Sequence, residues 1–175
     1  MFFPGVLEKE LANSKCSVYR TYVLYEGRNV EFGMSENTFI NDLNARDAMA
    51  RLHTADNAIL VDVRLAEELD DVGMPDVAKY LHAEWITMPF GAINPDFVSE
   101  VEQAGIARDA EIFVLCRVGS RSLPAAQALT EAGFDRVYNV IDGFEGEADE
   151  NGYRGTRGGW QFEGLPWKRP ERLVA

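Results

Sequence analysis

The chain contains one decisive run, which reads Ile112-Phe113-Val114-Leu115-Cys116-Arg117-Val118-Gly119-Ser120-Arg121-Ser122. Its first four residues are apolar and predict a buried strand that ends at Cys116, while a helix is predicted from Arg121 or Ser122. A residue between a strand's carboxyl end and a helix N-terminus lies where open parallel sheets usually carry their chemistry. Loop N–H groups and the helix dipole favour a negative sulfur there. We interpret Cys116 as a thiolate nucleophile; the arginines and glycine disfavour the alternative, a core cysteine with no chemistry.

Strands and helices alternate on both sides of this run. Asn44 is a predicted N-cap for a helix with an apolar stripe, and residues 94–105 predict a second helix. Further strands are predicted at 58–64, 82–88 and 137–140, the first of them a continuous apolar run. This alternation predicts an α/β fold, with a mostly parallel central sheet and helices on both faces.

A second strand delivers polar groups to the same edge of the sheet, because Asp62 and Arg64 end the run at 58–64. We interpret them as an ion pair or as loop-anchoring groups in preference to catalytic residues. Glu67 and Glu68 follow, and we interpret both as part of a solvated helix face.

Composition excludes several function classes. The 175 residues carry a net charge of -12, so a general basic face for nucleic acid or acidic lipid is not expected. The two cysteines, Cys16 and Cys116, form no disulfide framework or CxxC motif, and Cys16 lacks a glycine-arginine context. His53 is expected at a solvated helix end and His82 in a structural or exposed place, so no metal or cofactor is predicted. The absence of a signal peptide and of a long apolar stretch predicts a cytoplasmic protein without a membrane span.

Three parts are predicted along the chain. Residues 1–33 form an N-terminal extension that is rich in strand formers, compatible with a hairpin and predicted to be dispensable for activity. Residues 34–146 form the main domain. Residues 147–175 form a tail rich in glycine and tryptophan, which we expect to pack back on the domain because it is too apolar for a free tail.

Three segments, in order, resemble the rhodanese (sulfurtransferase) family and its single-domain members. They are Leu60-Val61-Asp62-Val63-Arg64, the run from Cys116 to Ser122, and the stretch from Ala132-Gly133-Phe134 through Asp142-Gly143-Phe144. The resemblance covers roughly residues 44–146. Many members of the family carry a glycine-histidine pair after the first of these segments. This chain has Gly73-Met74-Pro75 there, followed by an unusually long segment, 76–81, which alters one expected wall of the pocket.

The resemblance implies a reaction and a site. Cys116 would take the outer sulfur of thiosulfate or a persulfide and pass it to cyanide or to a thiol, such as glutathione or thioredoxin. The backbone N–H groups of residues 117–121, from Arg117 through Val118, Gly119 and Ser120 to Arg121, can cradle an anionic sulfur. The two arginines could hold the donor's oxygens, or Arg121 could brace the loop instead. Asp62, Arg64 and Ser122 are expected to support the site.

Two rival functions remain. A cysteine phosphatase or arsenate reductase places five residues between its cysteine and arginine, whereas four separate Cys116 from Arg121, which fits a single sulfur better. A non-catalytic rhodanese-like binding module is the other rival, and the presence of Cys116 counts against it.

Overall fold

The computed structural model describes residues 18–25, 28–35, 40–89 and 91–170. The chain divides into two compact units, Met1–Thr38 and Phe39–Ala175. In the first unit, β1 (Val18–Tyr25) pairs antiparallel with β2 (Arg28–Ser35). Cys16 and residues 26–27 between these strands lie outside the described residues. The dispensability of residues 1–33 for activity stays a prediction.

The second unit is built on a five-stranded sheet in which every pairing is parallel. In spatial order its strands are β3 (Asn41–Leu43), β10 (Arg136–Val140), β9 (Glu111–Leu115), β4 (Ala58–Asp62) and β6 (Tyr80–His82). All five residues of β9 are buried, as expected of the central strand. The predicted α/β fold with a mostly parallel sheet is confirmed.

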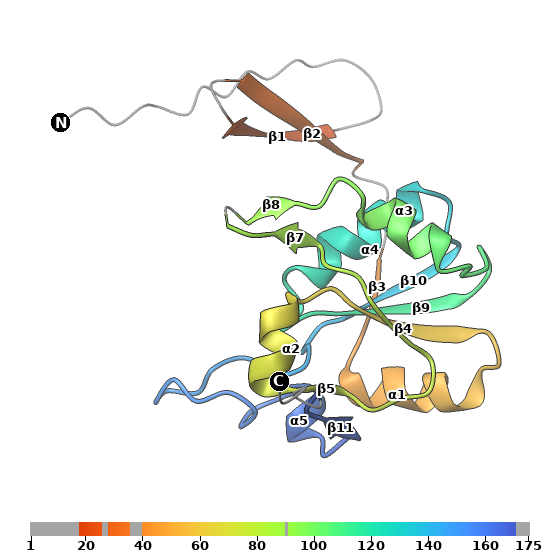
Figure 1. The fold of residues 1–175 in the computed structure, drawn as a ribbon, viewed down its shortest axis with the longest axis vertical. Coiled ribbons are helices and arrows are strands. Elements are labelled where there is room, and N and C mark those ends of the chain that lie inside the picture. Colours follow the sequence, from red (N-terminus) through yellow and green to blue (C-terminus); the bar gives the residue numbers. More distant parts are fainter. Residues whose placement is uncertain (1–17, 26–27, 36–39, 90, 171–175) are drawn as a thin grey trace, which may run out of the picture. The chain divides into compact units, whose positions relative to one another are not determined.

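Helices cover both faces of this sheet (Figure 1). On one face lie α3 (Phe97–Gln103) and α4 (Ser122–Glu131), which pack on Ile112 and Val114. On the other face lie α1 (Ala45–Thr54) and the short α5 (Gly159–Phe162), which pack on Phe113 and Leu115. Alternate residues of β9 thus serve the two core clusters. The helix α2 (Ala66–Val72) follows β4 and buries Leu69.

The sequence explains where α1 begins. The Asn44 side chain accepts a 2.8 Å hydrogen bond from the Asp47 backbone N–H, which satisfies a free donor of the first turn. Ala45, Ala48 and Leu52 form its buried stripe. His53 is exposed in the last turn, as expected from the sequence.

The strand predicted at 82–88 is wrong. The edge strand β6 ends at His82, and the chain then forms the short β7 (Ile86–Thr87), which pairs antiparallel with β8 (Ala92–Ile93). Part of the long segment at 76–81 therefore belongs to the sheet. The pattern concealed this because all three residues of β6 are only half-buried, so they show no apolar alternation.

The tail contributes to the core of this unit. Trp160 is fully buried beside Phe113 and Phe144, and its indole N–H donates to the Pro166 carbonyl at 2.8 Å. Further along, β11 (Trp167–Lys168) pairs antiparallel with β5 (Met74–Pro75).

Candidate functional site

Cys116 directly follows β9, at the carboxyl edge of the sheet. Its side chain is fully buried. The Gly119 backbone N–H donates to the sulfur at 3.2 Å, and the Ser122 hydroxyl oxygen lies 3.2 Å from the same sulfur. Two polar groups therefore contact the sulfur, one from the loop and one from the first residue of α4.

The loop holds its shape because two glycines allow close backbone contacts. Gly119 has φ +89, and a Cβ there would lie 2.1 Å from the Ile141 carbonyl oxygen. Gly143 has φ +62, and a Cβ there would lie 2.5 Å from the Arg117 carbonyl. Only glycine fits both the left-handed backbone and the lack of space.

The segment after β10 braces the loop through its backbone. The Phe144 N–H donates to the Cys116 carbonyl at 2.8 Å, and the Glu145 N–H donates to the Arg117 carbonyl at 3.0 Å. Two carbonyls of the loop are therefore fixed from outside, which leaves the N–H of Gly119 directed at the sulfur.

A chain of polar groups links the sulfur to the far edge of the sheet. The Ser122 hydroxyl donates to Asn139 Oδ1 at 2.7 Å, and Asn139 Nδ2 donates to Asp42 at 2.9 Å. Asp42 fixes the amide so that its oxygen faces Ser122. Because a hydroxyl has one proton, Ser122 serves either Asn139 or the sulfur at a given moment.

Arg121 braces the loop against α2. Its Nη1 and Nη2 atoms donate to the two carboxylate oxygens of Glu68 at 2.6 and 2.7 Å. Burial alone would raise the pKa of Glu68, but hydrogen bonds from Arg121 and from the Leu65 backbone outweigh it and hold this pKa below its ordinary value. The hydrogen bond to Glu68 raises the pKa of Arg121 despite burial.

Arg117 is paired as well. Its Nε donates to Glu145 at 2.6 Å, and the Glu145 side chain is only 7% exposed, against 41% for the arginine. Both arginines of the loop therefore carry a carboxylate partner.

Asp62 and Arg64 form a fully buried ion pair, with a shortest contact of 2.6 Å. The guanidinium lies 4.1 Å from the centre of the Phe144 ring, and its Nη1 has no hydrogen-bond partner among the described residues. Tyr80 donates to Asp62 at 3.2 Å, and burial followed by this negative charge raises the pKa of Tyr80 far above its ordinary value. Because the Phe144 ring contacts Arg64 and the Phe144 backbone N–H bonds the Cys116 carbonyl, the ion pair supports the segment that braces the loop.

The structure thus brings most of the predicted site residues together around Cys116. Gly119 is buried in the loop, Val118 is half-buried and Ser120 is exposed. His82 is structural, because its Nε2 lies 2.7 Å from the Arg64 carbonyl oxygen.

Three carboxylates and an amide contribute to the site although no sequence pattern assigns them to it. Glu68 was predicted to lie on a solvated face, and this is wrong, since it is half-buried against Arg121; its neighbour Glu67 is the exposed one. Glu145, Asn139 and Asp42 were not singled out. A usable signal exists only for Asn139, a polar residue between Tyr138 and Val140 in a strand whose one charged residue, Arg136, lies at its start.

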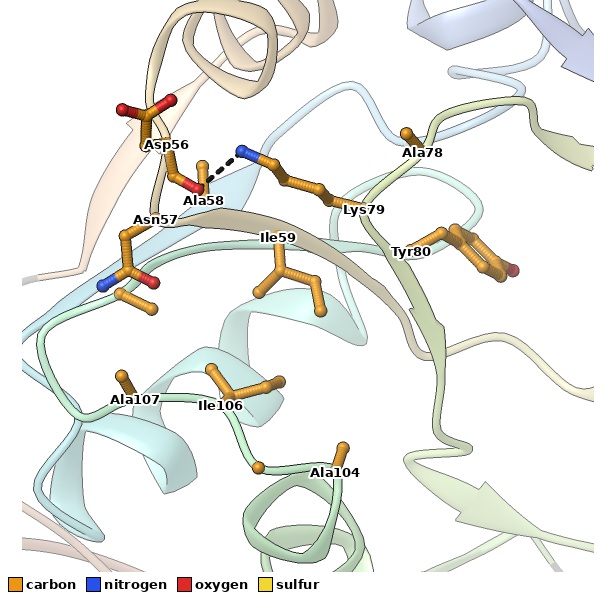
Figure 2. Close-up of a pocket in the computed structure, with 12 residues that line it drawn as sticks. Asp56, Asn57, Ala58, Ile59, Ala78, Lys79, Tyr80, Ala104, Ile106 and Ala107 are labelled. Atoms are coloured by element: carbon orange, nitrogen blue, oxygen red, sulfur yellow. Dashed lines mark hydrogen bonds between the residues drawn. The ribbon is translucent and has the colours of Figure 1, made fainter.

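A pocket of about 390 Å³ lies at the opposite, amino end of β4 (Figure 2). Its walls come from the start of β4, the segment before β6 and the residues after α3. The Lys79 ammonium group donates to the backbone carbonyls of Ala55 and Asp56 at 2.8 and 2.7 Å, so it is occupied in holding two loops together. The lining residues include no cysteine or histidine, and Cys116 follows the carboxyl end of β9, away from this pocket.

Among the described residues, no helix has both the length and the apolar character needed to cross a membrane. The same part of the chain contains no group of three or more His, Cys, Asp or Glu side chains placed to hold a metal ion.

Comparisons with known proteins agree with this fold. A family model described as the STR4 middle domain matches residues 41–174. The crystal structure of Rv0390 from M. tuberculosis superposes with a TM-score of 0.70 at 39% identity, covering 76% of this chain and 100% of that one. An uncharacterized RP600 homolog of Rickettsia rickettsii is 37% identical over 129 residues, which are 70% of this chain and 98% of that protein.

More distant relatives have functional names. A sulfurtransferase of Allochromatium vinosum is 24% identical over 132 residues, or 75% of this chain and 98% of that protein. A rhodanese-like/PpiC domain-containing protein of Arabidopsis thaliana is 28% identical over 115 residues, or 64% of this chain and 35% of that protein.

Proposed function

Because the chain belongs to the rhodanese-like family whose model is described as the STR4 middle domain, we propose that it transfers sulfane sulfur through a persulfide on Cys116. The observation that carries this proposal is the 3.2 Å hydrogen bond from the Gly119 N–H to the buried Cys116 sulfur. A sulfur nucleophile needs its thiolate form, and an N–H donor in a fixed loop stabilises that form.

The proposed reaction has two steps. The Cys116 thiolate attacks the outer sulfur of the donor, an S–S bond to the protein forms, and the donor's own bond to that sulfur breaks with both electrons. Thiosulfate would leave as sulfite, and a persulfide would leave as its parent thiolate. A thiol or cyanide acceptor then attacks the outer sulfur and releases the Cys116 thiolate.

In this proposal the residues around Cys116 have different roles. Gly119 and Ser122 stabilise the sulfur, and the segment from Gly143 to Glu145 keeps the loop rigid. Neither step needs a general base, a metal or a redox cofactor, because the sulfane sulfur keeps its oxidation state. Glutathione and thioredoxin are the thiol acceptors that we propose, and a reducing cytoplasm is the compartment that suits a free thiol.

Intact-protein mass spectrometry tests the proposal. After incubation with thiosulfate or with an organic persulfide, the protein should gain the mass of one sulfur atom and lose it again on addition of cyanide. The gain should be absent in Cys116→Ser and present in Cys16→Ser.

Two results would contradict the proposal. Failure of every donor to load sulfur on Cys116 would favour a binding module. Turnover of an aryl phosphate without any sulfur transfer would favour a phosphatase.

A further inference from the structure

The charges around the loop are balanced in an unexpected way. The loop has two arginines, and an anionic donor would be drawn to them if they were free. Instead, Glu145 accepts from Arg117 at 2.6 Å, and Glu68 accepts from both Nη atoms of Arg121 at 2.6 and 2.7 Å. Arg64, which contacts the Phe144 ring, is likewise paired with Asp62.

These carboxylates are fixed partners. The Glu145 side chain is 7% exposed and that of Glu68 is 19% exposed, so each is more buried than its arginine. A doubly charged donor that pulled an arginine away would leave a carboxylate buried without a counter-charge, which is costly. If the ion pairs stay intact, the side chains around the loop carry no net positive charge, and the donor approaches a negatively charged sulfur.

Two exposed residues close to the loop are apolar. Leu123, the second residue of α4, is 38% exposed, and Ile141 is 47% exposed while its carbonyl packs against Gly119. A donor with a small apolar body would bury part of these side chains, which a sulfate-like group would not do favourably.

We infer that Glu68 and Glu145 are specificity-determining residues, which make the site select a singly charged organic sulfane-sulfur donor over the doubly charged thiosulfate ion. This inference rests on the proposed sulfur transfer and names its donor class. The shared chemistry is a terminal sulfane sulfur on an organic group, whether a persulfide or a thiosulfonate.

Methanethiosulfonate is the matched probe, since a methyl group replaces one charged oxygen of thiosulfate. Its reaction is balanced: the Cys116 thiolate takes the terminal sulfur, the sulfur–sulfur bond of the donor breaks, and methanesulfinate leaves with the electron pair. Two negative charges enter and two leave. With thiosulfate, sulfite leaves and three negative charges enter and leave.

The experiment measures the rate of sulfur addition to Cys116 for both donors by quenched-flow mass spectrometry. Each rate is divided by the rate of the same donor with free 2-mercaptoethanol, which removes the intrinsic difference in reactivity. We expect the normalised rate to favour methanethiosulfonate by at least about tenfold, because one more unit charge near a thiolate raises the barrier strongly.

Two variants and one control assign the preference to the carboxylates. Glu68→Gln and Glu145→Gln should each shift the ratio toward thiosulfate by about fivefold or more. Removing one negative charge from the site relieves twice as much electrostatic repulsion for a dianion as for a monoanion. Glu131→Gln changes the net charge equally at an exposed position at the far end of α4 and should leave the ratio within about twofold. If one glutamine variant fails to fold, the other carries the test.

The outcomes separate the two proposals. Sulfur loading that favours thiosulfate, or glutamine variants that shift the ratio no more than Glu131→Gln, overturns the role of the carboxylates while sulfur transfer stands. Absence of loading from both donors and from an organic persulfide overturns sulfur transfer itself.

Discussion

The two edges of the parallel sheet differ in what they hold. The amino edge has a pocket of about 390 Å³ whose single lysine is tied to backbone carbonyls. At the carboxyl edge a cysteine and an ion pair are fully buried, and a chain of polar side chains from Asp42 through Asn139 to Ser122 ends at the cysteine sulfur. The difference teaches that open volume is a poor guide to chemistry in this fold. Strand ends and helix starts place the reactive groups.

Removing one member of the buried ion pair should have the largest effect. Asp62→Asn leaves Arg64 charged and fully buried, so we expect a loss of about 3 to 5 kcal/mol in the free energy of unfolding. Urea denaturation measures it. Glu102→Gln breaks the exposed pair with Arg108 and should cost less than about 1 kcal/mol. Equal losses in the two variants would show that burial does not distinguish the pairs.

The second prediction concerns Gly119. In Gly119→Ala the new Cβ would collide with the Ile141 carbonyl, so the loop must move and its N–H leaves the sulfur. Sulfur loading should fall by about 100-fold, equivalent to roughly 2.7 kcal/mol. Gly133→Ala is the matched control, because Gly133 has a similar φ of +91 but open space around it.

That control should cost about 1 kcal/mol of stability and keep its loading rate. A loading rate in Gly119→Ala equal to that of Gly133→Ala would mean that the close approach to Ile141 is irrelevant to the sulfur.

The third prediction tests the chain of polar groups that ends at the Cys116 sulfur. Ser122→Ala removes a contact with the sulfur and leaves Asn139 Oδ1 without its donor, so loading should slow by about tenfold and stability should fall by about 1 to 3 kcal/mol. Ser99→Ala, whose hydroxyl bonds the Asp96 carbonyl at the start of α3, should leave the loading rate unchanged. Unaltered loading in Ser122→Ala would assign Ser122 a purely structural role.

The smallest expected effect depends on pH. The folded state lowers the pKa of Glu68 below its ordinary value of 4.5, so its contribution to stability is complete above that pH and is lost as the pH falls through the lowered value. Wild type should exceed Glu68→Gln by about 1 kcal/mol in free energy of unfolding at neutral pH, and the gap should close in acid. Glu67→Gln, on the exposed side of α2, should show no such gap. A gap that widens in acid would reverse the sign of this linkage.

The sequence predicts an element of the fold correctly where its residue pattern is typical of only one structural environment. The continuous apolar runs of β4 and β9 mark strands covered on both faces, and Asn44 marks the start of α1. The edge strand β6 was missed because its three residues are all half-buried and carry no period. Local patterns cannot reveal such a strand, whose existence depends on pairing with β4.

The residues of the site also fall into those that the sequence predicts and those that it does not. Cys116, Gly119 and Ser122 lie within seven consecutive residues, so their meeting could be predicted from local geometry. The partners of the loop arginines come from 53 and 28 residues away, and Asp42 lies 97 residues from Asn139. A glutamate on a short helix is predicted to be solvated when its distant partner is not known, and this is why the prediction for Glu68 is wrong.

Close glycine contacts join the tail to the end of the main domain. A Cβ on Gly146 would lie 2.2 Å from the Gly158 carbonyl oxygen, and one on Gly159 would lie 2.6 Å from the Gly146 nitrogen. The Gly146 N–H in turn donates to the Arg117 carbonyl at 3.3 Å. A gene fusion or truncation that joined foreign sequence after residue 146 would therefore remove the layer on which the segment bracing the cysteine loop rests. A functional transplant of this unit therefore has to include the tail at least through Gly159.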